Sequence, residues 1–204
     1  MSQRCAIIIF AKAPMAGLAK TRLIPALGAD GAAALAERML DWTLAAATAA
    51  DIGPVILCCT PTTGHPAFAS AVEQYGVILG EQGEGDLGAR MNRALTLALQ
   101  NHSAALVIGT DCPTLDADHL RRAASMLRTT PAVFIPATDG GYVLAGLSVP
   151  MPTLFEAIAW STDRVMAQTR ERLTSIKVVA AELSPMQDID VPADLMHLPR
   201  EWLK

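Results

Sequence analysis

The sequence has little of what marks several common protein classes. Only 4% of its 204 residues are aromatic, so alanine, leucine, isoleucine and valine must build most of the core. The four cysteines form no Cys-x-x-Cys pair and no ligand spacing with histidine, which argues against a zinc site and favours free thiols in a reducing, cytoplasmic setting. No apolar run is long enough to span a membrane, and a net charge of −4 argues against general nucleic-acid binding. We therefore expect a soluble globular protein with neither a membrane nor a nucleic acid as partner.

What the sequence does contain is an alternation of short apolar runs with longer amphipathic segments. The runs are continuous, as in strands of a parallel sheet covered on both faces, and they lie at 5–10, 54–59, 104–109 and 132–136. Helical patterns are found at 30–50, with Asp30 as its N-cap, and at 87–101, 116–128, 162–173 and 191–198. A last strand is expected at 176–181. This order predicts one α/β domain over residues 1–204.

One stretch, residues 132–147, breaks the alternation of strand and helix. Two apolar runs are joined there by Ala-Thr-Asp-Gly-Gly, a short link that favours an antiparallel pair of strands. The glycines that follow Asp139 allow either a tight reversal or a close approach of the backbone to a ligand, and the residues alone do not decide between the two.

A cationic loop follows the first predicted strand. Lys12, Lys20 and Arg22 surround Gly17 within eleven residues. A flexible turn with lysine and arginine donors suits an oligophosphate, and ligands of such sheets bind beyond the carboxyl ends of the strands. The alternative is a surface loop whose cations are only solvated, but the position of the loop favours phosphate binding.

The loop matches a P-loop only in part. Gly17, Lys20 and Thr21 give the spacing Gly-x-x-Lys-Thr. However, Ala13 stands where the first glycine of a P-loop belongs, and Ala19 separates the lysine from any preceding glycine. We therefore expect a phosphate site of another kind.

Aspartates supply the candidate metal ligands. Asp111 directly follows the strand at 104–109, where a carboxylate can hold Mg²⁺ (or Mn²⁺) that is shared with substrate phosphates. The alternative for Asp111 is a turn-stabilising role, the role that we expect of Asp116 as a helix cap. Asp188 and Asp190 arrive late in the chain and could complete the site, although Asp190 also has the sequence context of an N-cap. Arg90, in the first turns of the helix at 87–101, either reaches a phosphate or faces solvent.

Taken in order, these segments resemble a known superfamily. The stretches FAKAPMAGLAKTRL, GDLGARM, GTDCPTL, ATDGGYVLAGL, AWST and DIDVPADL are similar to those of nucleotide-diphospho-sugar transferases with the GT-A fold. More closely, they resemble a small bacterial glycosyltransferase-like family first described as a domain of unknown function, some of whose members are linked with arsenosugar biosynthesis. AKTRL and DIDVPADL also resemble guanylyltransferases of the deazaflavin cofactor pathway and, more distantly, molybdenum cofactor nucleotidyltransferases.

The resemblance implies a fold and a set of roles. The fold is a Rossmann-related, mixed and mostly parallel sheet with helices on both faces. The cationic loop (Lys12, Gly17, Lys20, Thr21 and Arg22, with Arg90 nearby) holds nucleotide phosphates. Asp111 is the counterpart of the superfamily's metal ligand, and Asp190 is the second ligand, with Asp188 as its competitor. The catalytic residues are Asp111, Lys20 and Asp139, the last as the base of the acceptor or a sugar contact.

The resemblance also bounds the reaction. We expect glycosyl transfer from a nucleoside-diphosphate sugar to a small acceptor, with Mg²⁺ as cofactor. The alternative is nucleotidyl transfer from an NTP to a phosphorylated acceptor, and the loop lacks the Gly-Gly-x-Ser/Gly-x-Arg pattern of most such enzymes. A nucleotide-binding protein without catalysis is the second alternative. The base, the sugar, the acceptor and the oligomeric state are not readable from the sequence.

Overall fold

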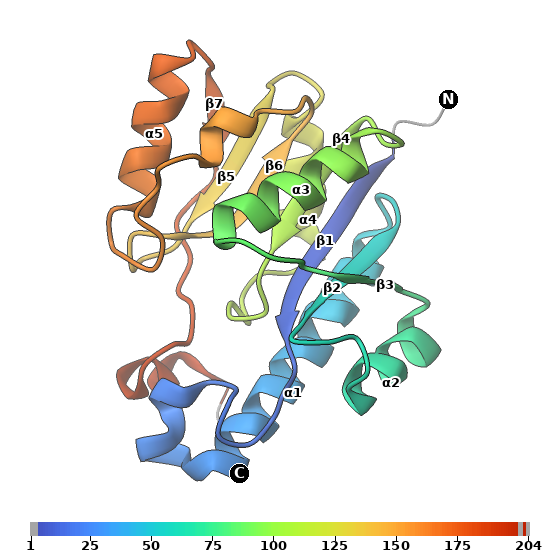
Figure 1. Cartoon of the computed structure of the whole chain (residues 1–204), viewed down its shortest axis with the longest axis vertical. Helices are drawn as coiled ribbons and strands as arrows, with labels where there is room; N and C mark the ends of the chain where they lie inside the picture. The colour runs from blue at the N-terminus through green and yellow to red at the C-terminus, as the bar shows by residue number, and fades with distance from the viewer. Residues whose placement is uncertain (1–3, 200–201, 203–204) are drawn as a thin grey trace.

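A seven-stranded sheet forms the centre of the computed structural model, which describes residues 4–199 and Trp202 (Figure 1). In chain order the strands are β1 (Cys5–Lys12), β2 (Val55–Thr60), β3 (Ile78–Glu81), β4 (Ala104–Ile108), β5 (Ala132–Pro136), β6 (Tyr142–Leu147) and β7 (Ala180–Glu182). In space they lie in the order β3-β2-β1-β4-β6-β5-β7. Among these described strands, β6 alone runs antiparallel to its neighbours. The predicted mixed, mostly parallel sheet is therefore confirmed, as is the antiparallel pair within 132–147.

Helices cover both faces of this sheet, as predicted. They are α1 (Ile24–Ala50), α2 (Pro66–Tyr75), α3 (Leu87–Leu99), α4 (Ala117–Met126) and α5 (Val165–Ser175), with short 3-10 turns η1 (Thr21–Leu23), η2 (Pro152–Phe155) and η3 (Pro192–His197). Side chains of α1, α2 and α4 pack on one face, and those of α3, α5 and η2 pack on the other. Figure 1 shows α3 and α5 in front of the sheet and α1 behind it.

The continuous apolar runs are explained by this two-sided cover. Successive residues of a strand point to opposite faces, so Ile7 and Ile9 join the cluster under α1 and α4 while Ala6 and Ile8 join the cluster under α3. All are buried. The four cysteines are also free and buried, and burial raises the pKa of the Cys5 thiol to about 12 and that of Cys58 to about 11.

Several predicted boundaries are corrected. The first helix begins at Ile24, before the predicted start, and Gly28 kinks it with a φ of +73°. The predicted helix from residue 30 corresponds to the long part after this kink, and Asp30 lies inside α1 and not at its N-cap, which is Leu23. The last predicted helix is instead the six-residue 3-10 helix η3, and the backbone is extended again at Leu198. The strand predicted at 176–181 is shorter and begins at Ala180. By contrast, Asp116 caps α4 as predicted, accepting from the N–H of His119. Asp86 caps α3 in the same way, accepting from the N–H of Ala89.

The sheet order places a crevice beside β1. The chain leaves β1 for β2 on one side and returns to β4 on the other, and ligands of open α/β sheets bind at such a switch point. The segment after β1 lies beside the C-terminal segment at the bottom of Figure 1, where blue and dark red ribbons meet. Leu23, Leu35 and Met39 pack there against Ile189 and Leu198. Two segments from opposite ends of the chain therefore meet at the carboxyl ends of the strands.

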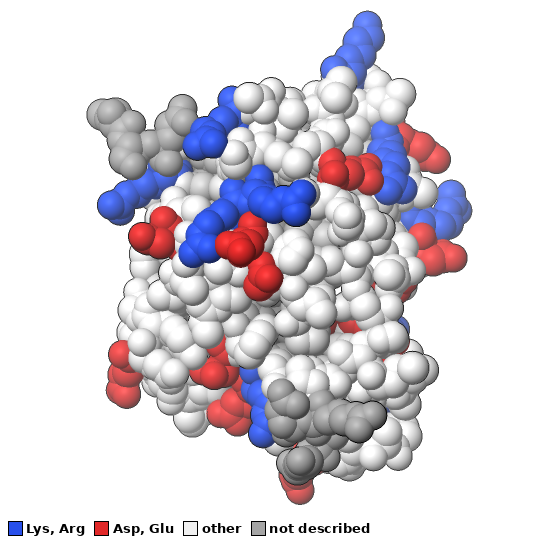
Figure 2. Space-filling view, turned by 180° about the vertical axis from the view of Figure 1, so that it is seen from behind, with Lys and Arg blue, Asp and Glu red and all other residues white. Residues whose placement is uncertain are grey.

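The surface carries charges of both signs. On the face opposite to that of Figure 1, basic and acidic side chains are interspersed (Figure 2). One such pair, on α4, joins Arg121 to Asp118 at 2.6 Å. Within the described residues there is no helix of the length and apolarity needed to cross a membrane.

Candidate functional site

A cavity of about 480 Å³ opens at the carboxyl ends of the central strands. Its wall contains the last residues of β1 and β2, the residues that directly follow β3 and β4, and the first residue of β6: Lys12, Thr60, Gln82, Gly109 and Tyr142. Parallel strands end at the same edge of a sheet, and an antiparallel strand begins there, so these five positions meet although they are far apart in sequence. The cavity lies where the sequence places a phosphate site.

The cationic loop turns its lysine inward. Gly17 has a φ of +79°, a conformation that favours glycine, and Lys20 itself adopts a left-handed φ of +46° at the start of η1. This geometry buries the Lys20 side chain, which is only 8% exposed. Its Nζ lies 2.6 Å from Oδ1 of Asp111 and donates to the backbone oxygen of Ile189. Lys20 is therefore a buried cation at the inner wall of the cavity.

Arg22 forms a second, more exposed ion pair. Its guanidinium contacts the carboxylate of Asp190, and the two side chains are 64% and 41% exposed. The N-cap interpretation of Asp190 is wrong, because Asp194 Oδ2 accepts from the N–H groups of Asp190 and Val191 at 2.9 and 2.8 Å. Asp194 thus folds the start of η3 and leaves the Asp190 carboxylate free to face Arg22.

The segment that carries Asp190 is fastened to the loop after β4. The N–H of Ile189 donates to the backbone oxygen of Asp111 at 2.8 Å. Three segments, 17–22, 109–111 and 188–190, are therefore held together by main-chain and ionic contacts. Lys20, Arg22, Asp111 and Asp190 all line the cavity.

Asp188 lies at the acidic side of the same region. It is half-buried, and its pKa is raised to about 6, first by burial and then by the negative charges of Asp139, Asp111 and Asp190. The charges of three neighbouring carboxylates therefore act on Asp188 at this edge of the sheet. Asp188 and Asp139 are not among the described residues that line the cavity.

Two kinds of divalent-cation site can be compared with these carboxylates: a closed site made of protein ligands alone, and an open site that substrate phosphates and water complete. Mutually repelling carboxylates favour a bound cation, which supports a metal site. However, the described residues contain no group of three histidine, cysteine, aspartate or glutamate side chains arranged to hold a metal ion. Mg²⁺ is commonly held by one or two carboxylates together with substrate phosphates and water. Asp111 with Asp190 fits that open arrangement, and a closed protein cage does not fit.

Replacing Asp188 by asparagine is expected to stabilise the protein at neutral pH. An acid whose folded-state pKa is raised from 3.8 to about 6 makes the folded state lose stability as the pH rises through that window. Since the carboxyl group is half-exposed, solvent screening reduces the cost to about 1 kcal/mol at pH 7. Urea unfolding at pH 4 and pH 7.5 should show that Asp188→Asn gains stability only at the higher pH.

A control with the opposite sign is available for this measurement. Arg170 holds the pKa of Glu182 below its usual range through two hydrogen bonds, so Glu182→Gln should lose stability at pH 7.5. A gain for Glu182→Gln, or no gain for Asp188→Asn, would contradict the electrostatic account.

Asp139 and its two glycines form a tight reversal between β5 and β6. Asp139 Oδ1 accepts from the N–H of Gly141 at 2.8 Å. Gly140 has a φ of +94°, and a Cβ at this position would lie 2.1 Å from the backbone oxygen of Asp163. The N–H of Met166 donates to the oxygen of Gly140 at 2.8 Å. The close approach that these glycines permit is thus to the start of α5.

Only some of the remaining residues predicted to bind phosphate line the cavity. Lys12 and Thr21 are exposed and line the cavity. Gly17 provides the turn but is not part of the described lining. Arg90 also lies outside that lining, and its Nε donates to the backbone oxygen of Gly85 at 2.9 Å. The structure therefore does not bring Arg90 to the cluster of Lys20 and Arg22.

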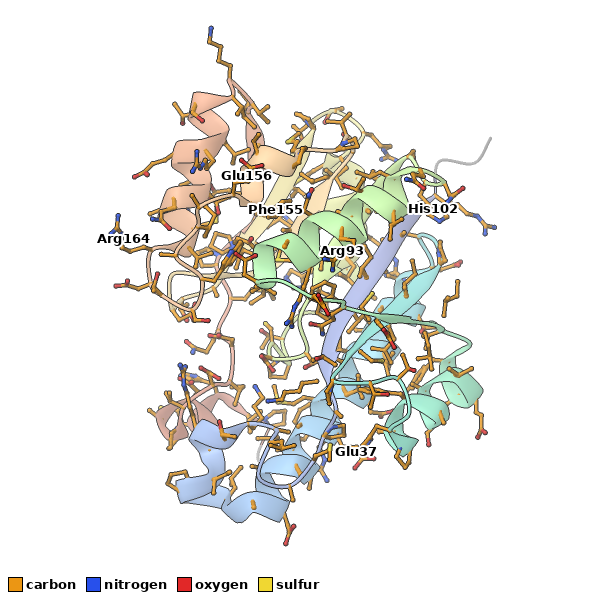
Figure 3. All side chains as sticks on the ribbon, viewed as in Figure 1. Glu37, Arg93, His102, Phe155, Glu156 and Arg164 are labelled. Carbon is orange, nitrogen blue, oxygen red and sulfur yellow. The ribbon has the colours of Figure 1, made fainter. Side chains whose placement is uncertain are left out.

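Two residues that shape the cavity carry no recognisable sequence signal. Gln82 is buried, and its Nε2 donates to the oxygens of Ala11 and Cys58 at 3.2 and 3.1 Å, which joins the ends of β1 and β2. Arg93, on α3 in Figure 3, donates to the oxygens of Gln82 and Glu84, both at 2.8 Å. Because α2 and β3 were not predicted, nothing in the sequence indicated that Gln82 directly follows a strand.

The chain matches a known protein family over more than half of its length. A family model described as an uncharacterized protein conserved in bacteria (DUF2064) matches residues 43–162, which is more than half of the chain. The chain belongs to this family. The DUF2064 match contains Asp111 and Asp139, whereas the cationic loop and the segment 186–190 lie outside it. No curated protein matches the chain.

Solved structures extend the comparison for this DUF2064 member. A provisionally assigned nucleotide-diphospho-sugar transferase from Desulfovibrio desulfuricans is 28% identical, with a TM-score of 0.87 over 98% of this chain and 88% of its own. A nucleotidyl transferase from Methanothermobacter (14% identity, TM-score 0.66, 98% of each chain) shares the fold. So does a cytidylyltransferase from Leptospira borgpetersenii (15% identity, TM-score 0.59, 95% of this chain and 84% of that one). The GT-A-like fold is confirmed, and so is the resemblance to a bacterial family of unknown function.

Proposed function

We propose that this protein is a transferase that uses a nucleotide-activated donor, and that it transfers a glycosyl group from a nucleoside-diphosphate sugar to a small acceptor. The observation that carries the proposal is the buried Lys20 facing Asp111 inside a cavity at the carboxyl ends of the strands. The 28% identical Desulfovibrio protein, which is provisionally assigned to the same class, supports it.

The residues of the chain suit the bond changes of this reaction. An acceptor hydroxyl oxygen attacks C1 of the donor sugar and gives its proton to a base, for which Asp139 is the candidate. The bond between C1 and the phosphate oxygen breaks, and that oxygen leaves with the electron pair. Lys20 and Arg22 would neutralise the charge that develops on the departing diphosphate. Mg²⁺ held by Asp111, with Asp190 or Asp188, would supply further charge neutralisation to the same phosphates.

Nucleotidyl transfer remains the second candidate, because two of the structural neighbours are nucleotidyl transferases with the same fold. In that reaction an acceptor phosphate attacks the α-phosphorus of an NTP and pyrophosphate leaves. The same lysine and arginine would neutralise the pyrophosphate. The two candidates therefore differ in the leaving group and not in the residues.

A screen of nucleotides tests the proposal. We expect ADP, CDP, GDP, UDP or a corresponding sugar nucleotide or NTP to raise the melting temperature in the presence of Mg²⁺. Incubation of the stabilising compound with candidate acceptors then identifies the leaving group: a nucleoside diphosphate indicates glycosyl transfer and pyrophosphate indicates nucleotidyl transfer. Binding without any turnover would favour a non-catalytic nucleotide-binding protein. No stabilisation by any nucleotide would contradict the whole class.

Replacing Asp139 by asparagine is expected to lower turnover about 100-fold, the usual contribution of a general base. Asparagine keeps the side-chain oxygen that accepts from Gly141, so the turn and the melting temperature should be preserved. The kcat with a saturating donor is the measurement. A variant with unchanged kcat would remove Asp139 from the proposed mechanism.

A further inference from the structure

Two cations of the proposed phosphate site, Lys20 and Arg22, are already paired with carboxylates of the proposed metal site. Lys20 Nζ lies 2.6 Å from Asp111 Oδ1, and Arg22 contacts Asp190. The main-chain bond from Ile189 to Asp111 and the bond from Lys20 to the oxygen of Ile189 hold the segments that carry Lys20, Asp111 and Asp190 near one another. In the ligand-free protein these four charges therefore neutralise one another in two ion pairs.

This pairing obstructs each ligand taken alone. A phosphate that binds Lys20 must compete with the Asp111 carboxylate, and a divalent cation that binds Asp111 must compete with the Lys20 ammonium. In either case the displaced partner keeps a charge without a counter-charge, and this is costly for Lys20 because its side chain is 8% exposed. When both ligands arrive, every charge finds a new partner.

We infer that the site works by exchange of ion-pair partners: Lys20 and Arg22 pass from Asp111 and Asp190 to the phosphates of the nucleotide, while the two carboxylates pass to the divalent cation. The inference rests on the proposed function and adds its regulation. Metal and nucleotide bind with strong positive coupling, and each binds weakly without the other, which limits capture of metal-free nucleotides.

The two pairs contribute unequally to this coupling. The Lys20–Asp111 pair joins a buried ammonium to a carboxylate that is 52% exposed, whereas both members of the Arg22–Asp190 pair are exposed. Exposed ion pairs contribute little because water and salt screen them. The Lys20–Asp111 pair is therefore the one to vary.

The experiment uses two substitutions that should each tighten the binding of one ligand, whereas the simple removal of a binding residue would weaken binding. In Asp111→Asn, Lys20 is released, so a nucleoside diphosphate in EDTA should bind about tenfold more tightly than it binds wild type in EDTA. In Lys20→Met, Asp111 is released, so Mn²⁺ alone should bind several-fold more tightly than it binds wild type. In wild type, saturating Mg²⁺ should tighten nucleotide binding at least tenfold, within the usual range of coupling between sites.

Isothermal titration calorimetry with ADP, CDP, GDP, UDP and Mn²⁺ measures these affinities, and the melting temperature of each variant reports its folding. Asp116→Asn removes the same charge from the α4 cap and should leave nucleotide affinity in EDTA unchanged. Lys12→Met removes a cation from the cavity wall without breaking the Lys20–Asp111 pair, and should tighten Mn²⁺ binding less than Lys20→Met does.

The outcomes separate the inference from the proposed function. Tighter binding of the single ligand by both variants supports partner exchange, and should either variant fail to fold, the other gives the decisive sign. If wild type binds nucleotide equally with and without Mg²⁺, and neither variant gains affinity, the inference is overturned while the nucleotide site stands. If no nucleotide binds wild type even with Mg²⁺, the proposed function fails and the inference fails with it.

Discussion

Lys20→Met is expected to lower kcat about 1,000-fold while the protein stays folded. Removing one charged group that stabilises a leaving phosphate commonly costs between 100-fold and 100,000-fold, depending on how well other groups compensate. Among the cations of the loop, we expect the loss of Lys20 to lower kcat most, because its side chain is buried and is held by two partners. The measurement is release of nucleoside diphosphate at saturating donor and Mg²⁺.

Folding should survive this substitution for an electrostatic reason. Methionine fills a similar volume, and the Asp111 carboxylate that loses its partner is half-exposed and can be hydrated. The reverse change, Asp111→Ala, would strand a buried ammonium and should destabilise the protein more. Lys12→Met, an exposed lysine on the same wall, is the matched control and should cost less than tenfold in kcat. A similar loss for both lysines would show that Lys20 has no special role.

Gly140→Ala is expected to lower the free energy of unfolding by about 3 kcal/mol or more. A side chain at a φ of +94° is strained, and the added Cβ would lie 2.1 Å from the backbone oxygen of Asp163. Because the obstacle is backbone, no side-chain rotation relieves it. The start of α5 must move away from the turn that carries Asp139.

Gly141→Ala is the matched control for this measurement. It lacks a positive φ, and its Cβ would lie 3.1 Å from Asp139 Oδ1, an atom on a side chain that can shift. A loss of about 1 kcal/mol is expected there. Urea denaturation of both variants at one pH makes the comparison, and equal losses would refute the close packing of Gly140 on Asp163.

The parts of the fold that the sequence predicts are those governed by local chemistry. Continuous apolar runs identify β1, β2, β4 and β5, and the cap Asp116 follows from a side chain next to a helix start. The start of α1 is missed because Gly28 breaks its pattern, leaving only the later part visible from residue 30. The edge strand β3 is missed because it has four residues and a half-exposed environment.

In the candidate site, too, the sequence predicts what local chemistry sets and misses what depends on contacts between distant segments. Strand ends gather at one edge, so Lys12, Lys20 and Asp111 could be placed together from the sequence. The burial of Lys20 could not, because its second partner, Ile189, is 169 positions away along the chain. The role of Arg93 likewise depends on carbonyl groups of a loop whose path is set by tertiary contacts.

The buried cysteines provide an intrinsic reporter of how the sheet opens. A thiol reacts as its thiolate, and burial keeps all four thiols protonated at neutral pH and out of contact with reagents. Cys5, Cys58 and Cys59 lie in the central strands β1 and β2, while Cys112 follows Asp111. Alkylation of the first three therefore times the separation of the central strands, and alkylation of Cys112 times local opening beside the cavity.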